Sequence, residues 1–84
     1  MSLWEVRTKV GVDPDWPGCD IVCQSSRAVG SEWFLVVADD LQIAVVRDRP
    51  GVVSVEPAVD GSYVDNRTGA TVEVQGNGAR WRAF

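Results

Sequence analysis

Alternation of apolar and polar residues near the beginning of the chain constrains the fold more than any other feature. Between Leu3 and Val12, every second residue is apolar or Thr8, and the residues between them include three charges. The first set is Trp4, Val6, Thr8, Val10 and Val12, and the charged set is Glu5, Arg7 and Lys9. A period of two residues is typical of a strand with one buried and one solvated face. The pattern therefore predicts a strand over residues 3–12.

The last third of the chain predicts further strands. Four short segments, 52–59, 62–65, 70–75 and 79–83, read as strands and are separated by turns at 60–61, 66–69 and 76–78. The turns contain Asp-Gly and Asn-Gly, which are favoured in hairpins, so these segments predict an antiparallel meander. Residues 32–38 are apolar on both faces, which indicates a central strand that is covered on both sides.

Two segments between these strands are less clearly patterned. For residues 20–30 the sequence predicts a short helical or irregular segment with Asp20 as its N-cap. Residues 39–49 fit a helix with an Asp cap, an apolar face of Leu41, Ala44 and Val45, and Pro50-Gly51 after its end. The same residues also fit a strand, with a hairpin at Asp39-Asp40. The boundary signals favour the helix.

We therefore expect a single α+β domain over residues 1–84, with a small, mostly antiparallel sheet of five or six strands and one short helix. If residues 40–48 form a strand instead, an all-β barrel or sandwich follows. A chain of 84 residues in which 16 are Val has enough apolar content to fold, and Val favours strands. The predicted core consists of Trp4, Val6, Val10, Leu35, Val37, Val45, Val53, Val55, Val72, Val74 and Trp81.

The composition argues against several classes of function. The net charge of −4 opposes binding to nucleic acid or anionic lipid. In Arg80-Trp81-Arg82 the two arginines alone make a poor phosphate track, and the strand pattern turns Trp81 inward. The chain has no His and two Cys, so it lacks the usual catalytic pairs and the ligands of a zinc site. We expect no enzyme activity and no cofactor.

A calcium loop is also not expected at the acidic segment 13–24. Pro17 occupies a ligand position of the EF-hand pattern, and Gln24 stands where the closing Glu belongs. Asp13, Asp15 and Asp20 are therefore interpreted as turn residues, and no metal site is predicted.

No apolar run is long enough to span a membrane, and no basic segment followed by an apolar run marks a signal peptide. We therefore expect a cytoplasmic protein without a membrane partner. Seven of the eight cations are Arg, a bias that suggests a GC-rich bacterial or phage coding sequence.

Five residues are candidates for binding a protein partner. Trp16 lies in a loop flanked by prolines, where it either folds back over the core or anchors an interface. Asp13 and Asp15 flank it in the same loop. Asp39 and Asp40 either cap a helix or meet basic residues of a partner.

The function expected from these features is that of a non-catalytic, acidic protein-binding module. Such a module resembles an inhibitor or neutraliser in that it acts by surface complementarity on a protein, for example one with a basic surface. The first alternative is an assembly subunit, for example of a phage particle. The second is a small-ligand or metal-binding protein. The oligomeric state and the state of Cys19 and Cys23 stay open.

Overall fold

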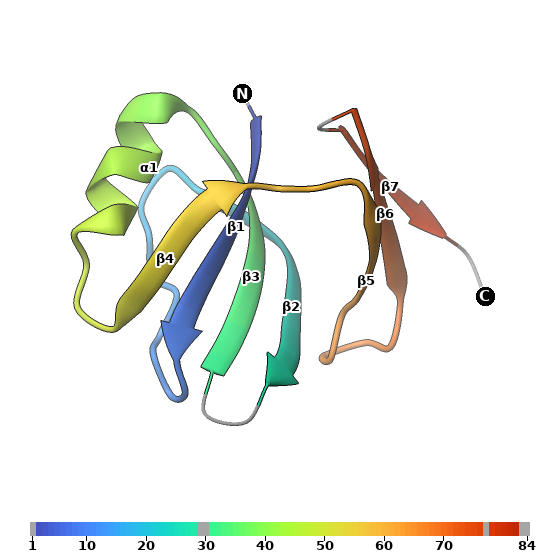
Figure 1. Ribbon diagram of the computed structural model, residues 1–84, viewed down its shortest axis with the longest axis horizontal. Helices are drawn as coiled ribbons and strands as arrows, with labels where there is room; N and C mark the ends of the chain where they lie inside the picture. Colours follow the sequence, from blue (N-terminus) through green and yellow to red (C-terminus); the bar gives the residue numbers. More distant parts are fainter. Residues whose placement is uncertain (1, 29–30, 77, 83–84) are drawn as a thin grey trace.

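The computed structural model describes residues 2–28, 31–76 and 78–82, with side chains for 2–24, 31–76 and 78. In these residues the chain forms seven strands and one helix (Figure 1). In chain order they are β1 (Ser2–Lys9), β2 (Asp20–Ala28), β3 (Ser31–Ala38), α1 (Asp40–Arg47), β4 (Val52–Pro57), β5 (Gly61–Val64), β6 (Thr71–Gln75) and β7 (Gly78–Arg82).

The first four strands form one antiparallel sheet in the order β2-β3-β1-β4. The alternating segment at the beginning of the chain lies in its middle as β1, where Val6 pairs with Phe34 of β3 and with Val55 of β4. The strand ends at Lys9, before the predicted end at Val12, because a turn at Val10-Gly11 follows it. Gly11 has a φ of +86°, which a residue with a side chain rarely adopts.

Residues 39–49 form the predicted helix and not the alternative strand. Asp39 is the N-cap: its carboxylate accepts a hydrogen bond from the Gln42 backbone N–H at 2.8 Å, and its own N–H donates to Gln42 Oε1 at 3.0 Å. This reciprocal capping box satisfies two backbone donors that the helix itself leaves unpaired. The local sequence therefore fixes where α1 begins.

The main core fills the space between α1 and the four-stranded sheet. Ile43 and Val46 point inward from the helix, and Phe34 and Val36 point toward them from β3. The other buried members are Val6, Trp16, Ala38 and Val55. Trp4, predicted in this core, is only partly buried against it, and its indole N–H donates to the Ala38 carbonyl at 3.1 Å.

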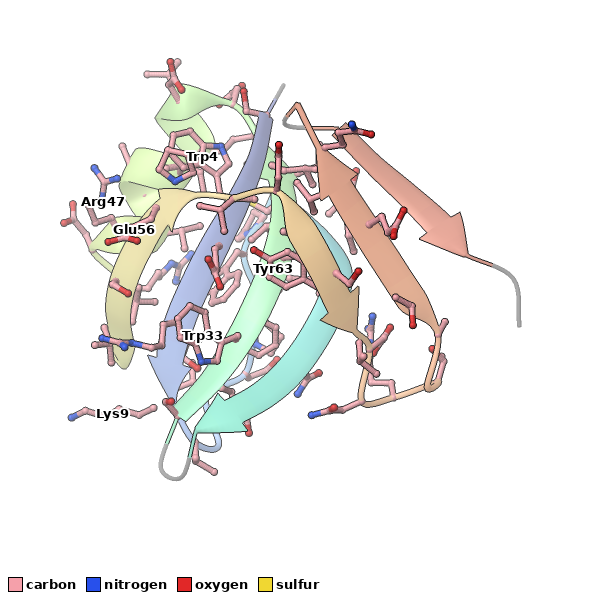
Figure 2. All side chains as sticks on the ribbon, turned by 45° about the vertical axis from the view of Figure 1, so that its right-hand side comes forward. Trp4, Lys9, Trp33, Arg47, Glu56 and Tyr63 are labelled. Atoms are coloured by element: carbon pink, nitrogen blue, oxygen red, sulfur yellow. The ribbon has the colours of Figure 1, made fainter. Side chains whose placement is uncertain are left out.

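A second core lies on the other face of the same sheet. There β5, β6 and β7 form a separate antiparallel sheet, from which Tyr63 points toward the first sheet (Figure 2). Tyr63, Val72 and Val74 share this core with Leu35 of β3. Leu3, Cys23 and Ala58 complete this cluster. Because both cores contact β3, the prediction of a central strand covered on both sides is confirmed.

The α+β prediction is confirmed, since the strands are antiparallel and one short helix covers one face of a sheet. The predicted meander holds for β5, β6 and β7 only, because β4 joins the first sheet beside β1. Within the part of the chain that the structure describes, no helix is long and apolar enough to cross a membrane.

The short helical or irregular piece predicted for residues 20–30 was wrong for residues 20–28. They form β2, which pairs with β3 through a register that shifts twice, between Ile21 and Cys23 and between Ser25 and Ala28. Each irregularity breaks the period of two, so the strand pattern was hidden in the sequence.

Three residues of the predicted core are exposed. Val10 lies in the turn after β1, and Val53 lies where the pairing of β1 with β4 shifts its register. Val45 lies on the side of α1 away from the sheet. Of the remaining predictions, Val6, Leu35, Val55, Val72 and Val74 are buried, Val37 is partly buried, and the Trp81 side chain lies outside the described residues.

Candidate partner-binding surface

Of the two positions expected for Trp16, the structure shows the one folded back over the core, so Trp16 is not exposed as an anchor. Its side chain is 5% exposed and packs in the main core. The ring meets Phe34 edge to face, with centroids 5.4 Å apart and planes at 84°, a favoured geometry for aromatic pairs. The loop that carries Trp16 is thereby drawn over the edge of the core beside Ile43 and Val46 of α1.

The four aspartates predicted to bind a partner are all exposed. Asp13 and Asp15 flank the buried Trp16 in its loop, and Asp39 and Asp40 begin α1. Asp39 also has a structural role as the N-cap, so its carboxylate is already engaged with the helix backbone. Asp40 lies in the first turn, where its charge complements the positive end of the helix dipole.

The loop and the helix bring further acidic charge to Cys19. Burial raises the pKa of the Cys19 thiol, and the carboxylates of Asp39 and Asp20 raise it further. Asp20 is exposed as well, so the beginning of α1 and the beginning of β2 form one acidic region around Cys19. Among the described residues, no three His, Cys, Asp or Glu side chains gather to hold a metal ion.

Cys19 and Cys23 are not joined by a disulfide, and they face different cores. Cys19 packs against the cluster under α1, whereas Cys23 is buried in the cluster between the two sheets. A disulfide needs the two Cβ atoms about 4 Å apart and directed toward each other. The sheet between the two cores prevents this arrangement.

The outer face of α1 is the most exposed apolar feature of the helix. Leu41 is 81% exposed and Val45 is 58% exposed, and Ala44 beside them is exposed as well. The sequence pattern predicts these three residues as the apolar face of the helix, with Val45 in the core. The structure instead buries Ile43 and Val46, so α1 has apolar residues on both sides.

Charged residues border this outer face, by which we mean Leu41, Ala44 and Val45. Asp39 and Asp40 precede it, and Arg47 and Arg49 follow it. Arg47 extends toward β4, where its Nη2 lies 3.5 Å from the Val55 carbonyl oxygen (Figure 2). The sequence contained a signal for this surface, because its apolar residues extend around the whole helix, a pattern typical of a helix that is buried on all sides.

Comparisons of the chain with protein-family models, with curated proteins and with solved structures found no match.

Proposed function

We propose that this protein is a non-catalytic protein-binding module that docks the outer face of α1 on a protein partner. The observation that carries the proposal is the exposure of Leu41 and Val45 on a helix whose other side already fills the core. Apolar helix faces of this kind bind in grooves, with residues at spacings of three and four as anchors. Leu41, Ala44 and Val45 have this spacing.

Burial of this face would provide useful binding energy. A fully buried Leu or Val side chain contributes roughly 1.5–3 kcal/mol. Leu41 is now 81% exposed and Val45 58% exposed, and only this exposed part is still available for burial. Its burial in a complex contributes about 3 kcal/mol for the two residues together. That amount corresponds to about a hundredfold in the dissociation constant. The capping box holds the helix in place before binding, so little ordering entropy opposes association.

The acidic residues at one end of the outer face indicate the chemistry of the partner. Asp39 and Asp40 lie at one end of the outer face. Asp13 and Asp15 in the neighbouring loop and Asp20 at the beginning of β2 add exposed negative charge. A partner with an apolar groove and a basic rim complements this surface, and the opposite charges accelerate association. The protein then acts as an inhibitor or neutraliser of a basic protein, without chemistry of its own.

The proposal also includes a compartment and a source. Cys19 and Cys23 lie on opposite faces of a sheet and are not joined by a disulfide, which fits a reducing compartment and supports the cytoplasm. The preference for Arg over Lys supports a bacterial or phage gene.

The test is quantitative affinity capture from a bacterial lysate with two matched double variants. L41A/V45A removes the outer face of α1, and V59A/V64A removes two valines that are 63% and 49% exposed elsewhere. We expect one protein to be captured by the wild type and by V59A/V64A and lost with L41A/V45A. Thermal denaturation should show all three proteins equally folded. Equal capture by both variants, or no captured protein, contradicts the proposal.

A second copy of the same chain is the other candidate partner for the outer face of α1, because charged residues at the two ends of the helix complement each other. Asp40 begins α1 and Arg49 follows its end, so two antiparallel helices place each Asp40 opposite Arg49 of the second copy. The protein would then be an assembly subunit. Light scattering over a range of concentrations tests this candidate: a mass that rises with concentration and falls back in L41A/V45A supports it, and a monomeric mass throughout excludes it.

A further inference from the structure

A depression of about 780 Å³ lies between β2 and the turn that joins β5 to β6. Figure 1 shows these two elements on the other side of the molecule from α1. Ligand sites in proteins commonly measure about 300–1,000 Å³. The lining residues are Ile21, Val22, Asp65, Arg67, Thr68 and Ala70. They form an apolar wall and a polar wall that contains one ion pair.

Asp65 is almost completely buried beside this depression, at 1% exposure. Its Oδ1 accepts hydrogen bonds from Arg67 Nε at 3.1 Å and from the Arg67 backbone N–H at 2.9 Å, and its Oδ2 accepts one from Arg67 Nη2 at 3.0 Å. These hydrogen bonds outweigh burial and lower the pKa of Asp65. Asp65 therefore stays ionised and holds the guanidinium in one orientation.

The backbone of the turn is equally well fixed. The N–H groups of Asp65 and Gly69 donate to the carbonyls of Ala70 and Asp65, at 2.9 and 2.7 Å. The Asn66 N–H donates to the Gln24 carbonyl at 2.7 Å, which ties the turn to β2. The wall that carries Arg67 is thus rigidly placed against the wall that β2 provides.

Arg67 keeps donors available for a ligand. Asp65 takes the Nε–H and one Nη2–H, and the rest of the guanidinium makes no hydrogen bond within the described residues. The Arg67 side chain is 49% exposed. The two terminal nitrogens of a guanidinium match the two oxygens of a planar carboxylate. Because the Asp65 carboxylate already balances the single positive charge of Arg67, the pair is neutral overall, and a singly charged carboxylate is repelled less here than a phosphate dianion is.

The remaining lining adds an apolar component. Ile21, Val22 and Ala70 present hydrocarbon beside the guanidinium. Thr68 Oγ1 accepts a hydrogen bond from the Ala70 N–H at 3.2 Å, which leaves the Thr68 hydroxyl proton available as a donor. We propose that this depression binds a monocarboxylate with an apolar chain, and that Arg67, preorganised by the buried Asp65, recognises its carboxylate. This proposal is independent of the function proposed for α1.

The test is to titrate small-molecule probes into the isotope-labelled protein near neutral pH and to monitor binding by the NMR chemical shifts of the backbone amides. The probes are octanoate, the uncharged 1-octanol, and acetyl-Ala-Leu with a free C-terminus. We expect octanoate or the dipeptide to shift the amides of residues 21–22 and 65–70, and to bind at least about tenfold more tightly than octanol. A response to octanoate alone identifies a free acid as the ligand, and a response to the dipeptide alone identifies a peptide C-terminus.

Two variants and a control complete the test. Ala70→Leu fills the depression without removing the ion pair, and should abolish the shifts in a protein that remains folded. Arg67→Lys keeps the charge and loses the planar donor pair, and should weaken binding at least about tenfold. Arg49→Lys, an exposed arginine outside the depression, should bind like the wild type. Absence of shifts up to about 10 mM probe, or equal binding of octanoate and octanol, overturns the proposal.

Discussion

Replacement of Trp16 by Ala should remove a large share of the stability of the whole domain. The Trp16 side chain is 5% exposed and forms an edge-to-face contact with Phe34, so its loss leaves a cavity under α1. Truncation of a buried aromatic side chain costs about 3–5 kcal/mol. A domain of 84 residues has a free energy of unfolding of about 4–13 kcal/mol. For a domain of this size, 1 kcal/mol lowers Tm by about 4–8 °C, so we expect a decrease of at least about 12 °C.

The assay is urea denaturation followed by far-ultraviolet circular dichroism, which reports the strands without depending on Trp16 itself. Trp16→Phe is included because a smaller ring can still contact Phe34, and it should cost less than half as much as Trp16→Ala. Trp33→Phe is the matched control. Trp33 is only partly buried, on the sheet face opposite α1, and its Nε1 is buried without a hydrogen-bond partner among the described residues (Figure 2).

A buried N–H without a hydrogen-bond partner costs about 1–3 kcal/mol, so its removal in Trp33→Phe is stabilising. This gain offsets the lost packing and the lost contact with the Arg7 guanidinium, which lies 5.5 Å from the ring centroid. We therefore expect Trp33→Phe to change the free energy of unfolding by less than about 1 kcal/mol. If Trp16→Ala also loses less than about 1 kcal/mol, Trp16 is not a core residue. Its assignment as an exposed anchor would then be restored.

Three further predictions concern ionisation and capping. Asp65→Asn should lower the free energy of unfolding at neutral pH by about 1–2 kcal/mol. The loss is no larger because Arg67 is half exposed and solvent screens its charge. Folding lowers the pKa of Asp65 from its usual value of 3.8. The ionised carboxylate therefore stabilises the folded protein at any pH above 3.8, and this stabilisation is lost as the pH falls below that value. Acid titrations of the wild type should show this loss, and those of Asp65→Asn should lack it. Asp39→Ala should cost about 1 kcal/mol in thermal denaturation through loss of the capping box, and Asp40→Ala less than that; equal losses would exclude the capping role. In thiol labelling of the native protein, Cys23 should stay protected, and Cys19 should react more slowly than an ordinary cysteine because its pKa is raised. Rapid labelling of both would contradict the burial of Cys23.

Helix α1 shows how far local sequence reasoning reaches. Its beginning at Asp39 and its end before Pro50-Gly51 follow from capping and backbone rules, and the structure agrees. Its orientation does not follow, because both sides of the helix are apolar. Leu41 and Val45 compete with Ile43 and Val46 for the core, and only the positions of β4 and the Trp16 loop select the second pair.

The candidate sites show the same limit. The exposed aspartates could be named from the sequence, since charged residues in turns and at helix beginnings are rarely buried. Asp65 follows the same rule in the sequence, and yet it is buried, because Arg67 pairs with it and the turn packs on β2. Trp16 could not be placed by any period, since its loop has none.

The sequence by itself determined the local conformations: the alternation that makes β1 a strand, the apolar run of β3, the cap of α1 and the hairpin turns among β5, β6 and β7. These features depend on neighbours within a few residues, where backbone sterics and hydrogen bonding decide. The tertiary structure alone decided which segments meet. It paired β4 with β1, made residues 20–28 a strand along β3, and folded the second sheet over Leu3 and Leu35. Such contacts join residues far apart in the chain, and their free energy depends on how all apolar faces are buried together, which no local pattern records.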